Sequence, residues 1–400
     1  MYKTEGGRPF AVVVGGELNG LGVVRSLARE RIPVVMVDTD RRRATMRTRF
    51  AHKFAISRLS GQPFIDELLR LRAAFDEKPV LILTQEASVA TVSAAYDAVS
   101  AAYHISMPLR ATMEMLLDKR LFQARAEALG FAIPRSVTLA PGDDGRALAD
   151  LRYPCVLKSV IKKPASHLPK AHRLMDAVSA RELWSRIGEA VGQAVVQEWI
   201  EGEDSDVHFC LQYRRRDGQA VSFTGRKTCQ WPPLVGGTAT CMPAANADAE
   251  LTATTNRFFD AVGFIGLGSM EYKCDRRDGR FYMVEPTVGR TDYQEEVATL
   301  NGVNLPYAAW LGEQGLPMAA STRPAPPIAW RDPYGHHNAV HGGAVDALET
   351  LAPKMRVADA YLRAGDPGPY LAARLEPVLK RLRRAATRPA ADGRTSAESV

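Results

Sequence analysis

The chain has 400 residues and carries 52 lysine and arginine side chains against 45 aspartates and glutamates, a formal net charge of +7. Hydrophobic residues at 46% and charged residues at 24% are ordinary for a globular protein and exclude wholesale disorder, a collagen-like repeat and a coiled coil. No stretch approaches the ~18 uninterrupted apolar residues of a membrane-spanning helix, so we expect no integral membrane segment.

The positive charge is concentrated at the end of the chain. Residues 374–400 hold seven basic and three acidic side chains, which account for +4 of the +7. The rest of the chain is near neutral, so we expect no nucleic-acid partner. The five cysteines are scattered without a C-x-x-C pair, and the first residues show no charged leader followed by an apolar stretch. Both features favour a reduced, cytoplasmic location.

The first part of the chain has the pattern of a parallel α/β domain. Apolar runs at 10–14, 32–38 and 79–84 predict buried strands, and "GGELNGLG" after the first of them opens a segment with helical spacing. Strand, glycine turn, helix and strand form a βαβ unit, so we predict a small α/β domain over residues 1–112. The glycine segment lacks the G-x-G-x-x-G spacing of a dinucleotide site, and we assign no nicotinamide cofactor to it.

Beyond this domain the predicted elements pair locally. A helix is predicted over 119–129, and strands at 153–158 and 194–200 precede two hairpins with "RRDG" turns. Local pairing indicates an antiparallel α+β half, in contrast to the parallel first domain. From residue 317 the chain becomes proline-rich, and we expect 317–400 to be a variable extension with a disordered end.

The second hairpin, "GLGSMEYKCDRRDGRFYMVEPTVGR", holds the sharpest signal. With a three-residue loop over 277–279, Glu271 faces Glu285 on one face of the sheet, with Cβ atoms about 5 Å apart. Carboxylates this close repel unless a cation lies between them, and Mg²⁺ commonly takes one or two carboxylates together with substrate phosphates. A two-residue loop would put the two carboxylates on opposite faces, and the sequence alone leaves both registers open.

Two further features indicate nucleotide chemistry. The strand in "AVVQEWIEGED" ends in groups that suit an adenine edge, and Glu203 or Asp204 could reach ribose hydroxyls. Lys119 opens a helix, Lys158 ends a strand and Lys227 lies in "FTGRKTCQWPP". Together with the two acids these cations indicate triphosphate binding, because phosphates need cations and Mg²⁺ needs both phosphates and carboxylates.

In this order the residues resemble the ATP-grasp superfamily, and within it the carboxylate–amine ligases. The resemblance covers roughly residues 10–315 and implies an ATP-grasp architecture. After the α/β domain would come a lid subdomain over 113–193 and an antiparallel ATP-binding subdomain over 194–316. The resemblance also implies ATP contacts from Lys119, Lys158, Glu198, the Ile200 backbone, and Glu203 or Asp204, and contacts to Mg²⁺ or Mn²⁺ from Glu271 and Glu285.

The chain departs from the family pattern at two places. The second metal acid is followed by "PTVGR" where the family often has an asparagine, so Thr287 takes the asparagine position and would supply an oxygen to the metal. The loop after Lys158 is basic without glycine, and Lys170 is the phosphate contact expected there. As catalytic residues we predict Lys227, on the basic strand of the family pattern, and Arg290, whose guanidinium would pair bidentately with a substrate carboxylate.

The implied activity is that of a Mg²⁺-dependent ligase. A carboxylate oxygen attacks the γ-phosphate of ATP to give an acyl phosphate and ADP, and an amine then displaces phosphate to form an amide. The expected partners are a small-molecule carboxylate and an amine, and a homodimer is left open. Two alternatives also stay open: a carboxylase or other acyl-phosphate ligase on the same scaffold, and a nucleotide-binding regulatory or scaffold protein without turnover.

Overall fold

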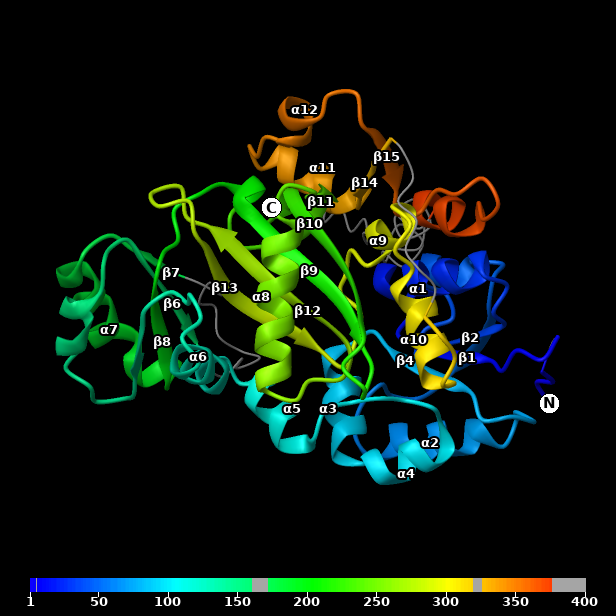
Figure 1. Ribbon diagram of the computed structural model, residues 1–400. Coiled ribbons are helices and arrows are strands. Elements are labelled where there is room, and N and C mark those ends of the chain that lie inside the picture. The colour runs from blue at the N-terminus through cyan, green and yellow to red at the C-terminus, as the bar shows by residue number, and fades with distance from the viewer. Residues whose placement is uncertain (5, 160–171, 319–325, 376–400) are drawn as a thin grey trace, which may run out of the picture.

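Three β-sheets organise the chain. The computed structural model describes residues 1–4, 6–159, 172–318 and 326–375. Figure 1 shows a parallel sheet on the right, a long and mostly antiparallel sheet in the centre, and a small sheet that projects on the left. In the described part of the chain, no helix is long and apolar enough to cross a membrane.

The parallel sheet lies in the N-terminal domain and has the strand order β3-β2-β1-β4. Its strands are continuous apolar runs because helices cover both faces, and no residue of β1 has exposed surface. Helices α2, α3 and α4 cover one face, and α1 covers the other. The strands are β1 (Ala11–Val14), β2 (Val34–Asp38), β3 (His52–Ala55) and β4 (Val80–Leu83). The helices are α1 (Leu18–Arg29), α2 (Gln62–Arg72), α3 (Glu86–Ala94) and α4 (Tyr96–Ala102).

The central sheet has seven strands in the order β13-β12-β9-β10-β11-β14-β15. All neighbours are antiparallel except β14 and β15. The strands are β9 (Val207–Arg214), β10 (Ala220–Trp231), β11 (Gly237–Pro243), β12 (Gly266–Cys274), β13 (Phe281–Val288), β14 (Ile328–Arg331) and β15 (Arg356–Asp359).

Alternate residues of the central strands face two different hydrophobic cores. On one face, Cys210 and Met270 pack with Phe258 of α8. On the other face, Phe209 and Leu211 pack with the helices that follow β13 and with α1 of the N-terminal domain. This alternation is expected for strands whose side chains point in turn to opposite faces. The helices around this sheet are α5 (Arg110–Leu117), α6 (Lys119–Ala128), α8 (Asp248–Ala261), α9 (Glu296–Leu300) and α10 (Leu305–Glu313).

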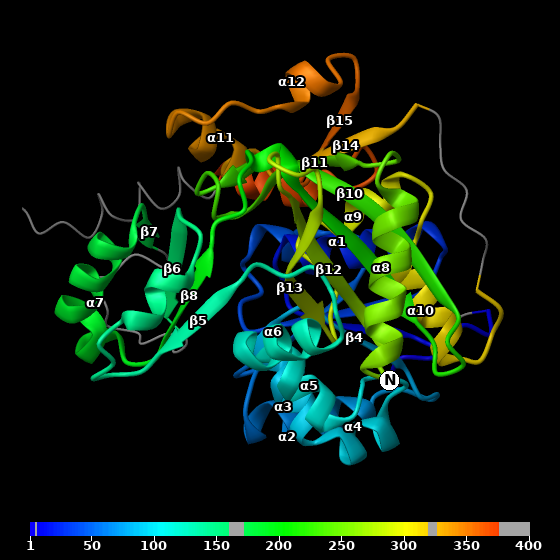
Figure 2. The same ribbon diagram turned by 60° about the vertical axis from the view of Figure 1, so that its left-hand side comes forward.

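The small sheet has its own core and the order β5-β8-β6-β7. Its elements are β5 (Ser136–Leu139), β6 (Cys155–Ser159), β7 (His172–Leu174), β8 (Ala194–Glu198) and the covering helix α7 (Ala177–Val191), which Figure 2 shows on the far side from the central sheet. The structure places β8 in this small sheet, whereas the predicted boundary put residue 194 at the start of the ATP-binding subdomain. The reason is that β8 pairs with β5 and β6.

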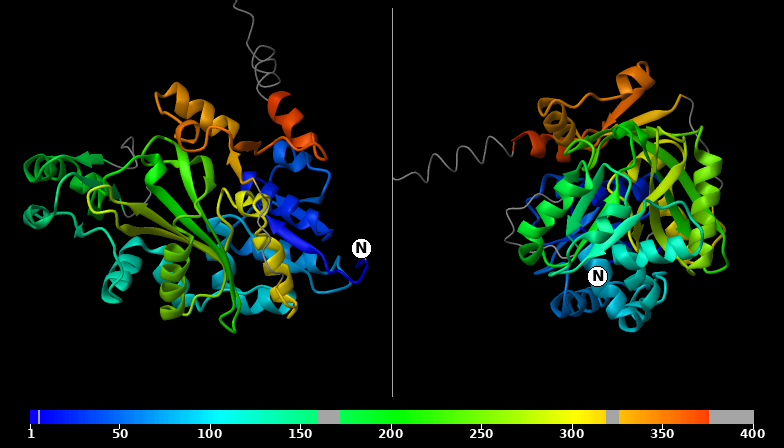
Figure 3. Two further views of the ribbon diagram at one scale, coloured as in Figure 1. Left: turned by 45° about the horizontal axis from the view of Figure 1, so that its top comes forward. Right: turned by 90° about the vertical axis from the view of Figure 1, so that its left-hand side faces the viewer.

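The segment after residue 325 is part of the fold. β14 and β15 extend the central sheet, and α11 (Pro333–His341) and α12 (Leu348–Leu351) lie above it. Figure 3 shows the chain after β15 running beside the N-terminal domain. Arg25 of α1 holds it there by donating to Asp366 (3.1 Å) and to the carbonyls of Ala360 and Tyr361 (both 2.7 Å). The end predicted to be disordered, beyond residue 375, lies outside the described residues.

Candidate active site

The two predicted metal acids face each other. Glu271 in β12 pairs with Glu285 in β13 in an antiparallel register. Directly opposed residues of an antiparallel pair point to the same face of the sheet. The structure therefore has the facing register, one of the two that the sequence left open, and the metal-binding role of the pair is taken up below as a proposal.

The turn that joins the two strands differs from both predicted turns. The amide of Asp275 donates to the carbonyl of Arg280 (2.9 Å), so four residues, 276–279, form the loop. Gly279 has a φ of +70°, in the left-handed region that favours glycine. The three-residue loop and its two-residue alternative are both wrong.

A β-bulge corrects the register that this longer loop produces. Beside the turn, Tyr272 faces Met283, and the next pair is Glu271 with Glu285. Val284 therefore has no partner across the ladder, and this extra residue shifts β13 by one position. Without the bulge Glu285 would fall out of line with Glu271, because side chains alternate between the two faces.

Each acid has its own lysine. Lys227 Nζ of β10 lies 2.6 Å from Glu271 Oε2, and the lysine is only 4% exposed. Lys119 Nζ, at the first residue of α6, lies 3.1 Å from Glu285 Oε2, and both of these side chains are more than half exposed. The repulsion between the facing carboxylates is thus offset by two ammonium groups, one buried and one in contact with solvent.

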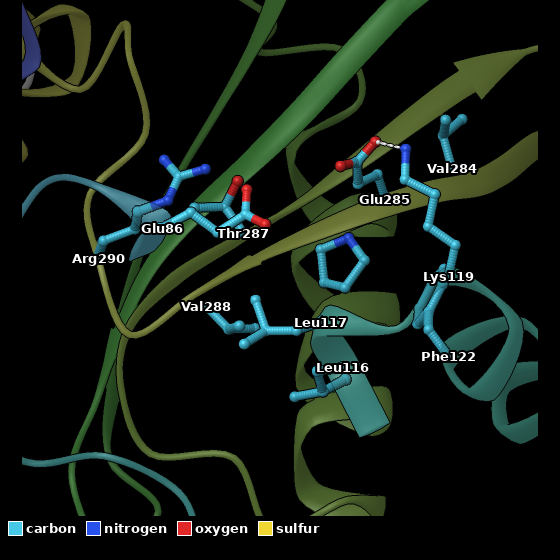
Figure 4. A pocket seen from close by; sticks show the side chains of 11 residues that line it. Glu86, Leu116, Leu117, Lys119, Phe122, Val284, Glu285, Thr287, Val288 and Arg290 are labelled. Carbon is cyan, nitrogen blue, oxygen red and sulfur yellow. Dashed lines mark hydrogen bonds and ion pairs between the residues drawn. The ribbon is translucent and has the colours of Figure 1, made fainter. Parts of the chain in front are cut away.

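Glu285 lies in a pocket between β13, α5, α6 and the N-terminal domain. Figure 4 shows the Lys119–Glu285 ion pair at one end of this pocket and Thr287, Arg290 and Glu86 at the other. Arg290 Nη1 donates to the carbonyl of Thr291 (3.1 Å). The structure therefore brings Lys119, at the start of α6, together with Glu285, Thr287 and Arg290 of the "EPTVGR" segment.

Sequence reasoning missed Glu86, which also lines this pocket. It is the first residue of α3 and follows β4 after a short turn. Ligands of open parallel sheets bind outside the carboxyl ends of the strands. The position of Glu86 just beyond a predicted strand was therefore the signal that could have found it.

The predicted adenine hinge connects the small sheet to the central sheet. Glu198 ends β8, and its side chain accepts from the backbone amide of Arg152 (2.9 Å). The ring of Trp199 makes cation–π contacts with two side chains. Arg173 Cζ lies 5.0 Å and Lys273 Nζ 4.6 Å from the ring centre. Burial lowers the pKa of Lys273.

The two predicted ribose acids have opposite surroundings. Glu203 is well exposed, with Oε1 at 3.8 Å from Arg276. Asp204 is 7% exposed, and its carboxylate accepts from the backbone amide of Gln230 (2.7 Å), from Gln230 Nε2 (2.9 Å) and from the amide of Leu234 (2.8 Å). The Asp204 oxygens are therefore engaged within the protein, whereas the Glu203 carboxylate is largely exposed.

Two further predicted phosphate-side lysines are Lys158 and Lys170. Lys158 lies in β6 opposite Val195 of β8. Its side chain, and Lys170 with the loop around it, lie outside the described residues.

The glycine segment after β1 is built for close packing. A side chain at Gly20 would place its Cβ 1.9 Å from the carbonyl oxygen of Gly15. The carboxylate of Asp38, at the end of β2, accepts from the amide of Gly16 (2.5 Å) and from Arg43 Nε (3.1 Å). Asp38 has no exposed surface, and both of its oxygens are engaged within the protein.

The arrangement is similar to several solved structures. An N5-carboxyaminoimidazole ribonucleotide synthetase in complex with ADP superposes with a TM-score of 0.62 at 12% identity, over 79% of this chain and 80% of that one. The chain has the ATP-grasp fold. The ATP-grasp architecture predicted from the sequence, with a parallel α/β domain and an antiparallel sheet, is therefore confirmed.

Other structures with the ATP-grasp fold match to a similar extent. The N5-carboxyaminoimidazole synthetase of Staphylococcus aureus has a TM-score of 0.61 at 15% identity, over 78% of each chain. The biotin carboxylase domain of Hydrogenobacter thermophilus 2-oxoglutarate carboxylase, in complex with MgADP and bicarbonate, has a TM-score of 0.60 at 13% identity, over 78% of this chain and 71% of that one. No protein-family model and no curated protein matches the chain by sequence.

Proposed function

We propose that this protein is a Mg²⁺-dependent, ATP-dependent ligase that joins a small-molecule carboxylate to an amine through an acyl phosphate. The observation that carries the proposal is the pair of facing carboxylates, Glu271 and Glu285, each beside a lysine and next to a pocket that holds Arg290. The ADP and MgADP complexes of the similar structures support nucleotide binding by a chain of this fold.

The donor set fits Mg²⁺ bound together with a nucleotide. Glu271 and Glu285 would hold the ion, with Thr287 on the same strand as an additional oxygen donor. Among the described residues no group of three or more histidine, cysteine, aspartate or glutamate side chains could hold a metal alone. Phosphate oxygens would complete the shell, as is usual for Mg²⁺. When bound, the ion neutralises charge on the transferring phosphoryl group.

The two lysines would act differently because their surroundings differ. An exposed ion pair contributes only about 0–1 kcal/mol, so phosphates can readily take Lys119 away from Glu285. The buried Lys227 keeps its place beside Glu271 and presents a fixed positive charge to the reacting carboxylate. Arg290 would orient that carboxylate, since a guanidinium binds a carboxylate through two parallel hydrogen bonds.

Bicarbonate is a second candidate for the carboxylate. The similar structures include a biotin carboxylase domain with bound bicarbonate. On this alternative the chain is a carboxylase that forms carboxyphosphate, and the amine nitrogen becomes carboxylated.

An ADP-release screen of the full chain tests the proposal. ATP and Mg²⁺ are incubated with paired carboxylates and amines, including bicarbonate, and product masses are recorded. We expect ADP release that requires one acid and one amine, with a product lighter than their sum by one water. Glu271→Gln and Glu285→Gln serve as matched controls and should be inactive.

Two outcomes contradict the ligase. ATP binding without ADP release for any pair identifies a nucleotide-binding regulatory or scaffold protein. ADP release with bicarbonate as the only acid that supports it, and with a product heavier than the amine by one CO₂, identifies the carboxylase.

A further inference from the structure

The buried Lys227 has a second partner besides Glu271. Its Nζ donates to Gln230 Oε1 at 3.1 Å, and both side chains are almost fully buried. Residues three apart in a regular strand point to opposite faces. Here β10 shifts its register against β11 twice, between Lys227 and Cys229 and between Cys229 and Gln230. These irregularities let the two side chains meet.

The orientation of the Gln230 amide follows from its neighbours. The Asp204 carboxylate can only accept hydrogen bonds, and the Lys227 ammonium can only donate them. Gln230 Nε2 must therefore point to Asp204 Oδ1 (2.9 Å), which leaves Oε1 for the lysine. Asp204 is itself held by the amides of Gln230 and Leu234 (2.7 and 2.8 Å).

We propose that Asp204 and Gln230 are positioning residues that fix the Lys227 ammonium and, through it, the Glu271 carboxylate. Asp204, Gln230, Lys227 and Glu271 form a continuous chain of contacts, which we call the β10 relay. With Lys227 anchored at Glu271 Oε2, the other oxygen of Glu271 stays available to a metal. This inference rests on the proposed function, because it assigns a cause to the placement of a proposed metal ligand.

The β10 relay also connects two parts of the nucleotide site. Asp204 begins the short 3-10 helix (Asp204–Asp206) directly after the adenine hinge, and Glu271 lies on the far side of β9 from β10. One end of the β10 relay, Asp204, is therefore close to the hinge in sequence. The other end is the proposed metal ligand Glu271, which the relay reaches through the side chains of Gln230 and Lys227. Groups that orient a metal ligand in this way typically change metal affinity or activity by about 10–100-fold when they are removed.

The test is Mn²⁺ binding to the full chain in the presence of ADP, measured by electron paramagnetic resonance with MnCl₂ as the probe. Gln230→Leu removes both side-chain hydrogen bonds at similar volume, and we expect it to weaken Mn²⁺ binding about tenfold or more. The dissociation constant of ADP without metal should stay within about twofold, since the hinge is unchanged.

Gln212→Leu is the matched control. Gln212 is a fully buried glutamine in the neighbouring strand β9, with its amide bonded to Ser222 and Asn256 on the opposite face. We expect Gln212→Leu to leave Mn²⁺ binding unchanged even where it lowers stability. Equal Mn²⁺ binding by Gln230→Leu and the unmodified protein, or an equal loss in both variants, would overturn the β10 relay.

A second variant covers failure of Gln230→Leu to fold. Asp204→Asn keeps the size and one acceptor, so we expect a smaller weakening of Mn²⁺ binding in the same direction, and unchanged binding overturns the relay. Absence of Mn²⁺ binding by the unmodified protein with ADP contradicts the metal site itself and with it the proposed function. A third outcome is that the unmodified protein binds Mn²⁺, that Glu271→Gln abolishes this binding and that Gln230→Leu does not change it. This outcome overturns the β10 relay but leaves the metal site and the proposed function intact.

Discussion

The ammonium of Lys227 lies 2.6 Å from the carboxylate of Glu271, and the lysine side chain has almost no exposed surface. The facing acid, Glu285, has its own lysine at 3.1 Å, yet that pair is in contact with solvent. Two carboxylates with one proposed role therefore stand in different surroundings. The loss of one partner destabilises the fold more for a buried ion pair than for an exposed one. Variants of the two acids should therefore have the same effect on activity and different effects on the free energy of unfolding.

Glu271→Gln and Glu285→Gln should both lose Mg²⁺-dependent turnover, but only the first should destabilise the fold strongly. Removing one partner of a buried pair costs about 3–5 kcal/mol, and the partial exposure of Glu271 points to the lower end of this range. The exposed Glu285 pair contributes at most about 1 kcal/mol. Urea unfolding of both variants measures the difference. Adding Lys227→Met to Glu271→Gln should recover stability without activity, and equal destabilisation by the two single variants would contradict the assignment.

Lys119→Ala should weaken ATP binding and leave stability unchanged. A charge-assisted hydrogen bond to phosphate contributes about 1.5–3 kcal/mol, which corresponds to about tenfold or more in affinity. The free energy of unfolding should move by less than about 1 kcal/mol because the Glu285 pair is exposed. Calorimetry with ATP and Mg²⁺ measures the affinity. Arg110→Ala, which removes an exposed pair with Glu114, is the control; an equal affinity in all three proteins removes Lys119 from the site.

Glu295→Gln should remove part of the pH dependence of stability. Burial, together with the neighbouring Glu296, raises the pKa of Glu295 to about 8, against 4.5 for the group in solution. Between these two values the folded state keeps a proton that the unfolded state has lost, so the free energy of unfolding falls as the pH rises, by up to about 1.4 kcal/mol per pH unit.

The measurement for Glu295 is urea unfolding at pH 5, 7 and 9 in the unmodified protein and the variant. We expect the free energy of unfolding of the variant, compared with that of the unmodified protein at the same pH, to be larger at pH 9 than at pH 5. The reason is that glutamine is neutral at both values, whereas Glu295 loses its proton at high pH. The partners Ser26 and Thr299 can bond to an amide as well as to a protonated carboxyl group. A constant difference between the two proteins across this range contradicts a protonated Glu295.

Arg25→Leu should destabilise the protein by about 3–5 kcal/mol, because it leaves the fully buried Asp366 without its guanidinium partner. Asp366→Asn keeps one oxygen that can accept from the amide of Arg49, and its NH2 group can donate to the Thr48 hydroxyl, so its cost should be smaller. Urea unfolding measures both variants. A loss below about 1 kcal/mol for Arg25→Leu would show that the segment after β15 does not depend on this anchor.

Much of the fold could be predicted because it follows from local patterns. Continuous apolar runs predicted β1, β2 and β4, since strands covered on both faces have no polar alternation. β3 was not predicted, because its side chains are partly exposed and no apolar run marks it. β14 and β15 were also missed, because they are short and become part of a sheet only when β14 pairs with β11 and β15 pairs with β14.

The order of charged residues along the chain was enough to indicate the ATP-grasp fold and to select Glu271 and Glu285 as candidate metal acids, with their register left open. The tertiary structure alone decided the loop length and the bulge at Val284 that make this pairing real. It also turned Asp204 inward to Gln230 and placed Lys227 beside Glu271. The physical reason is that periodicity specifies which face of a strand a side chain occupies, whereas its partners come from segments distant in sequence. Whether a charged group is buried with a partner or left for a ligand depends on those segments.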